Sequence, residues 1–264
     1  YPLPSTFLMT AIPAQVAGVR RIVVCTPRPA PEILVVAGEL GIEEIYTVGG
    51  AQAIAALAYG TKTIAPVSKI VGPGSAYVAA AKRLVARDTP IDFVAGPTEV
   101  LVIAPDVTSD PKGGDPFDLA QDKPSWLAAD LLAQAEHDED ATAILLTRSA
   151  RLARAVARAL VPQLASLPEG NPAAASLQKN GAILVVRDAE EAIALANEFA
   201  PEHLTVPAGF PLDRIQSAGS IFVGPHSPEA AGDYAAGPNH VLPTGGMARF
   251  RGGLSVLDFV KIIS

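Results

Sequence analysis

Two side chains that could bind a metal ion lie three residues apart in the segment 129–138. Gln134 and His137 occupy positions i and i+3 of an otherwise apolar stretch, and this spacing places both side chains on one face of a helix. A glutamine amide oxygen and an imidazole nitrogen can both coordinate a divalent cation without any thiol. The neighbouring Glu136 and Asp138 are charged, so the alternative is that the pair simply faces solvent.

Further acidic and basic groups follow downstream. Pro201 ends a helical pattern, so Glu202 and His203 are predicted at a junction between a loop and a strand. A carboxylate beside an imidazole supplies two proton acceptors with different pKa values, as general acid–base chemistry requires. Asp233 follows Gly232 in a segment interrupted by glycine and proline, where its carboxylate could be an oxygen ligand of the same cation. A surface position is the alternative for each of these residues.

Two glycine-containing segments, 49–52 and 72–75, each lie between a predicted strand and a predicted helix. Backbone N–H groups at such a helix start can bind a phosphate. Neither segment has the three spaced glycines of the dinucleotide fingerprint, so either could be only a tight turn. Because successive strands of a parallel sheet end at the same edge, where α/β folds bind ligands, the two segments together favour a ligand site.

The elements that must position these residues alternate along the chain. We predict strands at 21–26, 44–48, 69–71, 99–104, 142–147, 182–186 and 220–223, and helices at 30–41, 51–59, 75–87, 126–136, 150–166 and 190–199. This order predicts an α/β fold of two Rossmann-like βαβ lobes with mainly parallel sheets, residues 1–98 and 99–264. Turn-forming and charged residues at 106–124 predict an exposed insertion loop before the helix that carries Gln134.

Composition excludes several classes of partner. The net charge is −7 and the isoelectric point is near 5.1, without any run of Lys and Arg, which argues against nucleic acid and anionic membranes. No apolar run reaches the length of about 18 residues that a membrane span needs. Cys25 is the one cysteine, so no internal disulfide can form and a cytoplasmic protein is expected. A small-molecule substrate is the expected partner.

Several segments, taken together, closely resemble histidinol dehydrogenase. They are AIPAQVAGVRRIVV (11–24), VGGAQAIAALAYGT (48–61), KIVGPGSAYVAAAKRLV (69–85), AGPTEVLVIA (95–104), ADLLAQAEHD (129–138), NEFAPEHLTV (197–206), AGSIFVGPHSPEAAGDYAAGPNHVLPT (218–244) and LSVLDFVK (254–261). The resemblance runs nearly end to end, apart from the expected insertion. It implies NAD-dependent oxidation of L-histidinol to L-histidine through the aldehyde, the last step of histidine biosynthesis.

The resemblance also implies roles for individual residues. Gln134, His137 and Asp233 match ligands of one zinc ion per subunit and also contact the substrate. Glu202 matches the base that activates water for the aldehyde step, and His203 matches the group that handles the alcohol proton and contacts the substrate.

Three further positions match residues that bind the substrate or the cofactor. Thr98 occupies a substrate-contacting position that is usually serine, and it keeps the hydroxyl. Gln52 matches a residue that contacts NAD. Ser75 stands where asparagine is usual, which puts that contact with NAD in doubt. The first lobe would therefore be the NAD side, and the second would carry the zinc and substrate site.

The resemblance finally implies a homodimer whose site is shared between subunits. Family members carry a further segment after LSVLDFVK, with an acidic residue and a histidine zinc ligand that come from the neighbouring subunit, whereas this sequence stops at Ser264. One alternative is therefore a catalytically inactive fragment that keeps ligand binding or dimerisation. Another is a phosphosugar-binding α/β protein that uses the two glycine-containing segments and needs neither Gln134 nor His137.

Overall fold

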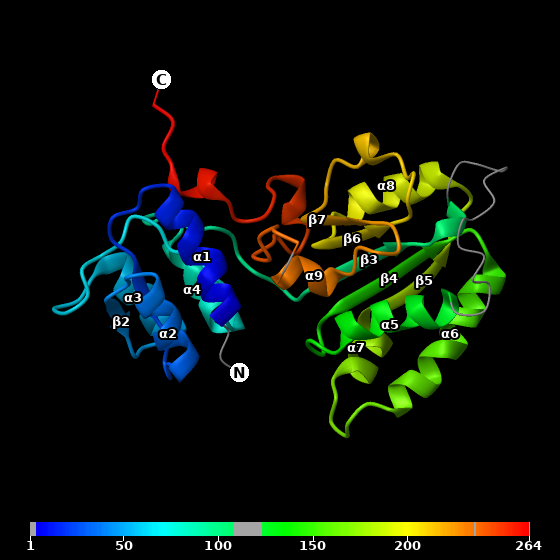
Figure 1. The fold of residues 1–264 in the computed structure, drawn as a ribbon, viewed down its shortest axis with the longest axis horizontal. Helices are drawn as coiled ribbons and strands as arrows, with labels where there is room; N and C mark the ends of the chain where they lie inside the picture. Colours follow the sequence, from blue (N-terminus) through cyan, green and yellow to red (C-terminus); the bar gives the residue numbers. More distant parts are fainter. Residues whose placement is uncertain (1–3, 108–122, 235, 264) are drawn as a thin grey trace. The chain divides into compact units, whose positions relative to one another are not determined.

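The computed structural model describes residues 4–107, 123–234 and 236–263, which form two compact units (Figure 1). Unit 1 consists of Tyr1–Gly96, Ala230–Pro243 and Gly253–Ser264, and unit 2 of Pro97–Glu229 and Thr244–Gly252. The expected lobes, 1–98 and 99–264, have a single boundary, whereas the chain returns to unit 1 twice after leaving it. Most of the predicted insertion 106–124 lies outside the described residues.

Unit 2 is built on a five-stranded parallel sheet with the strand order β5-β4-β3-β6-β7. Its strands are β3 (Glu99–Ile103), β4 (Thr142–Thr147), β5 (Gly181–Val185), β6 (His203–Val206) and β7 (Ser220–Val223). The chain begins in the centre at β3, winds outward to β5, and then returns to place β6 on the other side of β3. This is a doubly wound topology, and it confirms the predicted α/β fold with parallel strands.

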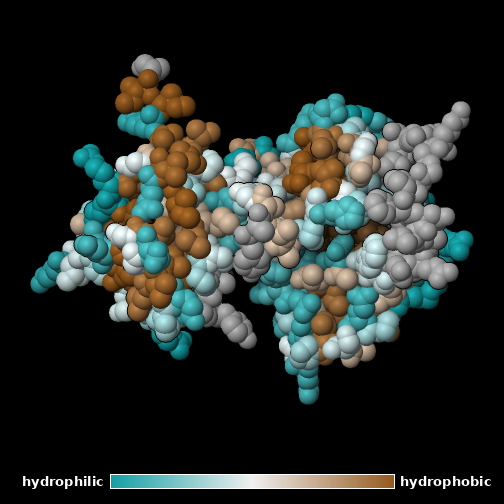
Figure 2. Space-filling view, viewed as in Figure 1, coloured by the Kyte–Doolittle hydropathy of each residue, from teal (hydrophilic) through white to brown (hydrophobic). Residues whose placement is uncertain are grey.

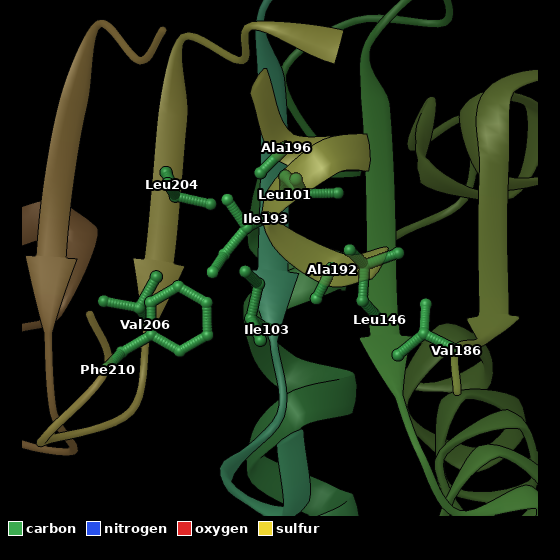
Figure 3. Packing of buried hydrophobic residues seen from close by; sticks show 10 residues of the cluster. All are labelled: Leu101, Ile103, Leu146, Val186, Ala192, Ile193, Ala196, Leu204, Val206 and Phe210. Carbon is green, nitrogen blue, oxygen red and sulfur yellow. The ribbon is translucent and has the colours of Figure 1, made fainter. Parts of the chain in front are cut away.

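Helices cover both faces of this sheet. They are α5 (Lys123–Ala135), α6 (Ala150–Ala165), α7 (Ala173–Asn180) and α8 (Ala189–Phe199). Side chains of β3 alternate between the faces, because successive residues of a strand point in opposite directions. Val100 and Val102 pack in the cluster that includes α5 and α6, whereas Leu101 and Ile103 pack in the cluster that includes α8 (Figure 3). Both faces of the sheet are therefore core, which explains why β3 is apolar from Val100 to Ile103.

The central strand should be the most sensitive part of this core. Leu101 is 2% exposed, so Leu101→Ala leaves a cavity and is expected to lower the free energy of unfolding by about 2–5 kcal/mol. Leu184→Ala, on the edge strand β5, removes the same atoms from a residue that is 42% exposed and should cost no more than about 1 kcal/mol. Urea unfolding of both variants measures the difference, and equal losses would contradict this assignment of the core.

Unit 1 contains a smaller sheet, in which β1 (Val23–Cys25) pairs in parallel with β2 (Glu44–Tyr46). Its helices are α1 (Pro4–Val16), α2 (Pro31–Glu39), α3 (Gly50–Tyr59) and α4 (Ala76–Val85), and α9 (Glu229–Tyr234) begins where the chain returns to this unit. Short 3-10 turns occupy Val256–Phe259 in unit 1, and Pro105–Val107, Leu212–Arg214 and Met247–Arg249 in unit 2. The predicted strand 69–71 is reduced to a single bridge between Ile70 and Ile91. Pro90 has no N–H with which to extend the ladder on one side, and on the other side the Gly72 N–H binds the Asp92 side chain instead.

Apolar side chains gather on the surface of unit 1 over α1 and α2 (Figure 2). Ile12 and Val16 on α1, and Leu34 and Val35 on α2, are between 43% and 69% exposed. Contiguous apolar surface of this kind often marks a face that another protein segment covers. Within the described residues, no helix combines the length and the apolar character that crossing a membrane requires.

Candidate functional site

Thr98, Gln134, Glu202 and His203 meet at the amino ends of two neighbouring strands of unit 2. Thr98 and Glu99 lie at the start of β3, and Glu202 and His203 lie at the start of β6. These strands are neighbours, with Val100 paired to His203, so their amino ends lie side by side. Doubly wound sheets usually bind ligands at the carboxyl ends of their strands, and this cluster is at the opposite edge.

A chain of hydrogen bonds joins three of the predicted site residues. Gln134 Nε2 donates to Thr98 Oγ1 at 2.5 Å, and Thr98 Oγ1 donates to Glu202 Oε2 at 2.6 Å. The backbone N–H of Glu99 donates to the same Glu202 oxygen at 3.1 Å. Gln134 is 3% exposed and Glu202 is 8% exposed, so these side chains have little freedom to move. The Thr98 hydroxyl therefore links the end of α5 to the Glu202 carboxylate.

His203 lies next to this chain of hydrogen bonds. Its Nδ1 is 3.9 Å from Glu202 Oε2, and its ring centroid is 5.8 Å from that of Phe222. It is the first residue of β6, as predicted from Pro201. A half-buried imidazole thus lies beside a buried carboxylate, which is a pair of groups able to exchange protons with a substrate.

His137 lies two residues beyond the end of α5 and is exposed, unlike Gln134. Its Nδ1 lies 3.0 Å from the carbonyl oxygen of Ala133. When Nδ1 donates to this carbonyl, Nε2 carries the lone pair, and metal-binding histidines commonly use this arrangement. The Gln134 amide nitrogen is similarly engaged by Thr98, which leaves Oε1 as the atom able to coordinate a cation. Both residues therefore fit a site for a zinc-like ion.

Asp233 belongs to unit 1, not to the lobe in which the sequence placed it. Its Oδ1 is 4.0 Å from His240 Nδ1, and His240 Nε2 lies 3.4 Å from Thr6 Oγ1. His240 was not predicted as a site residue, although it follows Asp233 by seven residues within the segment 218–244. In the part of the chain that the structure describes, no three His, Cys, Asp or Glu side chains form a cluster able to hold a metal ion.

Glu99 is a second residue that sequence analysis did not single out. Its Oε1 accepts a hydrogen bond from the N–H of Gly245 at 3.1 Å, whereas its Oε2 is buried and has no hydrogen-bond partner among the described residues. The Glu202 amide also hydrogen bonds to this carboxyl group, and Arg249 lies near enough to favour its charged form. Burial outweighs these contacts and raises the pKa of Glu99.

This buried carboxyl group should make stability depend on pH. The folded protein keeps a proton that the unfolded chain releases above the ordinary pKa of about 4.5. The free energy of unfolding should therefore fall as the pH rises from about 4.5 through the raised pKa of the folded state, and then level off. Glu99→Gln keeps the acceptor for Gly245 and cannot ionise, so its stability relative to the unaltered protein should increase across this range.

Urea unfolding at stepped pH values measures this effect. Glu169→Gln changes an exposed glutamate of the same unit and should follow the unaltered protein at every pH. Identical pH dependence in the Glu99→Gln variant and the unaltered protein would show that Glu99 keeps no extra proton on folding.

The two glycine-containing segments of unit 1 each lead into a helix. Gly49 is the N-cap of α3 and Ser75 is the N-cap of α4, and neither helix start has a side-chain cap. A Cβ at Gly49 would lie 2.8 Å from Pro27, and one at Gly74 would lie 2.6 Å from Val78. A side chain at Gly49 or Gly74 would therefore clash with its neighbours. The backbone N–H groups at each helix start have no side-chain partner, and a phosphate could bind them.

Gln52 and Ser75, the residues predicted to contact NAD, are both exposed at these helix starts. Gln52 lies in the first turn of α3, with its Oε1 over Gly50. Ser75 makes no capping hydrogen bond, so its hydroxyl is not committed to the helix start. Helices α3 and α4 pack against each other in unit 1. The two segments therefore belong to one packed pair of helices.

The sequence of this chain is similar to that of proteins of known function. The family model described as histidinol dehydrogenase matches residues 1–264. The chain belongs to the histidinol dehydrogenase family. Histidinol dehydrogenase of Rhodopseudomonas palustris is 54% identical over 265 residues, and that of Bacillus cereus is 52% identical over the same length. In each case the match covers 98% of this chain and 58% of the relative.

A solved structure agrees with this family assignment. The crystal structure of histidinol dehydrogenase from Elizabethkingia anophelis is similar with a TM-score of 0.87 and 42% sequence identity. The match covers 99% of this chain and 59% of that one. The α/β fold with parallel sheets is thus the fold of the family, and the chain spans a little more than half the length of the relatives it matches.

Proposed function

We propose that the protein containing this chain is a zinc- and NAD-dependent histidinol dehydrogenase that oxidises L-histidinol to L-histidine in histidine biosynthesis. The observation that carries the proposal is the hydrogen-bonded chain from Gln134 through Thr98 to Glu202, with His203 beside it. Family membership supplies the reaction, and this cluster supplies groups of the kind that the reaction needs.

Zinc would be held by Gln134, His137 and Asp233, and when bound it would supply a Lewis acid that holds the imidazole and amine of the substrate. The hydrogen bond from His137 Nδ1 to the Ala133 carbonyl leaves the lone pair of the ring on Nε2, where it could bind zinc. Thr98 would keep the Gln134 amide in one orientation and contact the substrate through its hydroxyl. These residues bind and orient the substrate.

Proton transfer would fall to Glu202 and His203. In the first oxidation His203 would accept the proton of the alcohol oxygen, and NAD⁺, when bound, would supply the acceptor for the hydride of the alcohol carbon. In the second oxidation Glu202 would accept a proton from the water that adds to the aldehyde carbon, and a second NAD⁺ would supply the acceptor for the hydride of that carbon. The hydrogen bonds from Thr98 and Glu99 to one oxygen of Glu202 fix its carboxylate for this task.

NAD would bind at unit 1 through the helix starts that contain Gln52 and Ser75. Their uncapped N–H groups support binding of the cofactor phosphates. The apolar surface over α1 and α2 supports a homodimer, because exposed surface of this kind is usually covered by another protein segment. A single cysteine, Cys25, supports action in the reducing cytoplasm.

The stoichiometry of the reaction tests this proposal. The protein from the complete reading frame, loaded with zinc, should form two NADH per L-histidinol consumed, measured by absorbance with the product quantified by chromatography. One NADH per substrate would limit the activity to the alcohol step. No NADH would favour the alternative, in which this chain keeps only ligand binding or subunit association.

A further inference from the structure

A buried ion pair in unit 1 has no part in the chemistry proposed above. Lys82 on α4 pairs with Asp92, and their side chains are 2% and 1% exposed. Lysine is rarely so deeply buried, and a buried ion pair stabilises a fold less well than apolar side chains of similar size commonly do. The groups that surround the pair should therefore explain its presence.

Both members of the pair bind the backbone of one residue, Gly72. Asp92 Oδ2 accepts a hydrogen bond from the Gly72 N–H at 2.8 Å, and Lys82 Nζ donates one to the Gly72 carbonyl at 2.9 Å. Asp92 Oδ1 also accepts from the N–H of Phe93 at 2.6 Å. The Gly72 N–H is thus bound by the Asp92 carboxylate, and the Gly72 C=O is bound by the Lys82 ammonium group.

Gly72 has a backbone conformation that glycine adopts without strain, so the hydrogen bonds to the ion pair select it from the many conformations open to glycine. Its φ is +109°, in a region that side-chain-bearing residues rarely adopt. Pro73 and Gly74 follow at once, and the segment ends at Ser75, the uncapped start of α4. The conformation of Gly72 therefore determines the direction in which this segment enters the helix.

We propose that Lys82 and Asp92 are positioning residues that hold the Gly72 peptide and thereby keep residues 72–75 in the conformation that receives the phosphates of NAD. The cofactor half of this inference rests on the proposed function. Neither side chain needs to contact NAD, because both act through the backbone of Gly72. An apolar pair could fill the same volume, but it could not bind an N–H and a C=O together.

The test compares a variant without the pair with a matched control, in the protein from the complete reading frame. Lys82→Met combined with Asp92→Val removes both charges and leaves apolar side chains, so no lone charge stays buried. Arg83→Met makes the same kind of change at the next residue of α4, which is exposed. Amide hydrogen exchange at Gly72 measures how firmly the ion pair holds this residue, and titration with NAD⁺ measures the affinity for the cofactor.

In the unaltered protein the Gly72 amide should exchange slowly. In the double variant this exchange should accelerate at least about tenfold, and the Kd for NAD⁺ should rise about tenfold or more because the binding segment is no longer preorganised. The Arg83→Met protein should match the unaltered one in both measurements. Circular dichroism establishes that each variant is folded.

Each possible result either supports or overturns the inference. A folded double variant with unchanged Gly72 exchange and unchanged NAD⁺ affinity would overturn the inference. If the double variant does not fold, hydrogen exchange in the unaltered protein still tests the inference. Exchange of its Gly72 amide at the rate of an unstructured peptide would show that the ion pair does not hold Gly72. If the unaltered protein binds no NAD⁺ while the double variant shows faster exchange, residues 72–75 are not an NAD site, but the role of Lys82 and Asp92 in holding Gly72 is supported.

Discussion

Glu202→Gln is expected to slow the oxidation of the aldehyde by about 10²–10⁴-fold, the usual contribution of a general base. Glutamine keeps the size of the side chain and can still accept hydrogen bonds from Thr98 Oγ1 and the Glu99 amide. It cannot accept a proton from water. The fold should therefore survive while the second oxidation fails, so that the aldehyde accumulates and NADH per L-histidinol falls from two toward one.

Rapid-mixing assays with L-histidinol and with its aldehyde separate the two oxidations. The control is Glu169→Gln, which makes the same change at an exposed glutamate of unit 2 and should leave both rates within about twofold. Equal slowing of both oxidations by Glu202→Gln would contradict a role confined to water activation. An unchanged aldehyde rate would remove Glu202 from the reaction altogether.

His137→Ala is expected to raise the Kd for zinc at least about 100-fold, since even residues that only orient metal ligands contribute 10–100-fold. The imidazole is exposed and contacts the backbone of its own segment through Nδ1. Its loss should therefore leave the stability of unit 2 nearly unchanged. Competition with a zinc-binding dye measures the affinity, and NADH formation should fall in proportion to the zinc lost.

The matched control is His226→Ala, at an exposed loop histidine to which no role is assigned. This variant should keep the zinc affinity of the unaltered protein. If His137→Ala binds zinc as tightly as His226→Ala does, His137 is not a ligand.

Most of the unit 2 sheet could be predicted from the sequence because its signals are local. Strands 142–147 and 220–223 were predicted with the bounds that the structure has, since each is a short run of mainly apolar and β-branched residues. Helices α1, α7 and α9 were missed. Pro13 lies inside α1, where a proline usually ends or kinks a helix, whereas α7 and α9 have only eight and six residues, too few to show a clear apolar period.

The candidate site was predicted as separate residues, but its arrangement was not. Thr98, Gln134 and Glu202 come together because β3 and β6 are neighbours in the sheet, and strand order cannot be deduced from local patterns. Glu99 could not be predicted because its carboxyl group is buried only in the folded chain, where it binds the N–H of Gly245, 146 residues away in sequence. Likewise, Asp233 belongs to unit 1 only because the chain returns there after β7.

The proposed zinc site is tested most directly by an anomalous difference map, collected at the zinc absorption edge, from crystals of the protein encoded by the complete reading frame. We expect a peak about 2.0–2.2 Å from His137 Nε2 and from Gln134 Oε1. This peak should lie near the Thr98 and Glu202 side chains at the amino ends of β3 and β6. A zinc peak bound by neither Gln134 nor His137, or one at the carboxyl edge of the sheet, would contradict it.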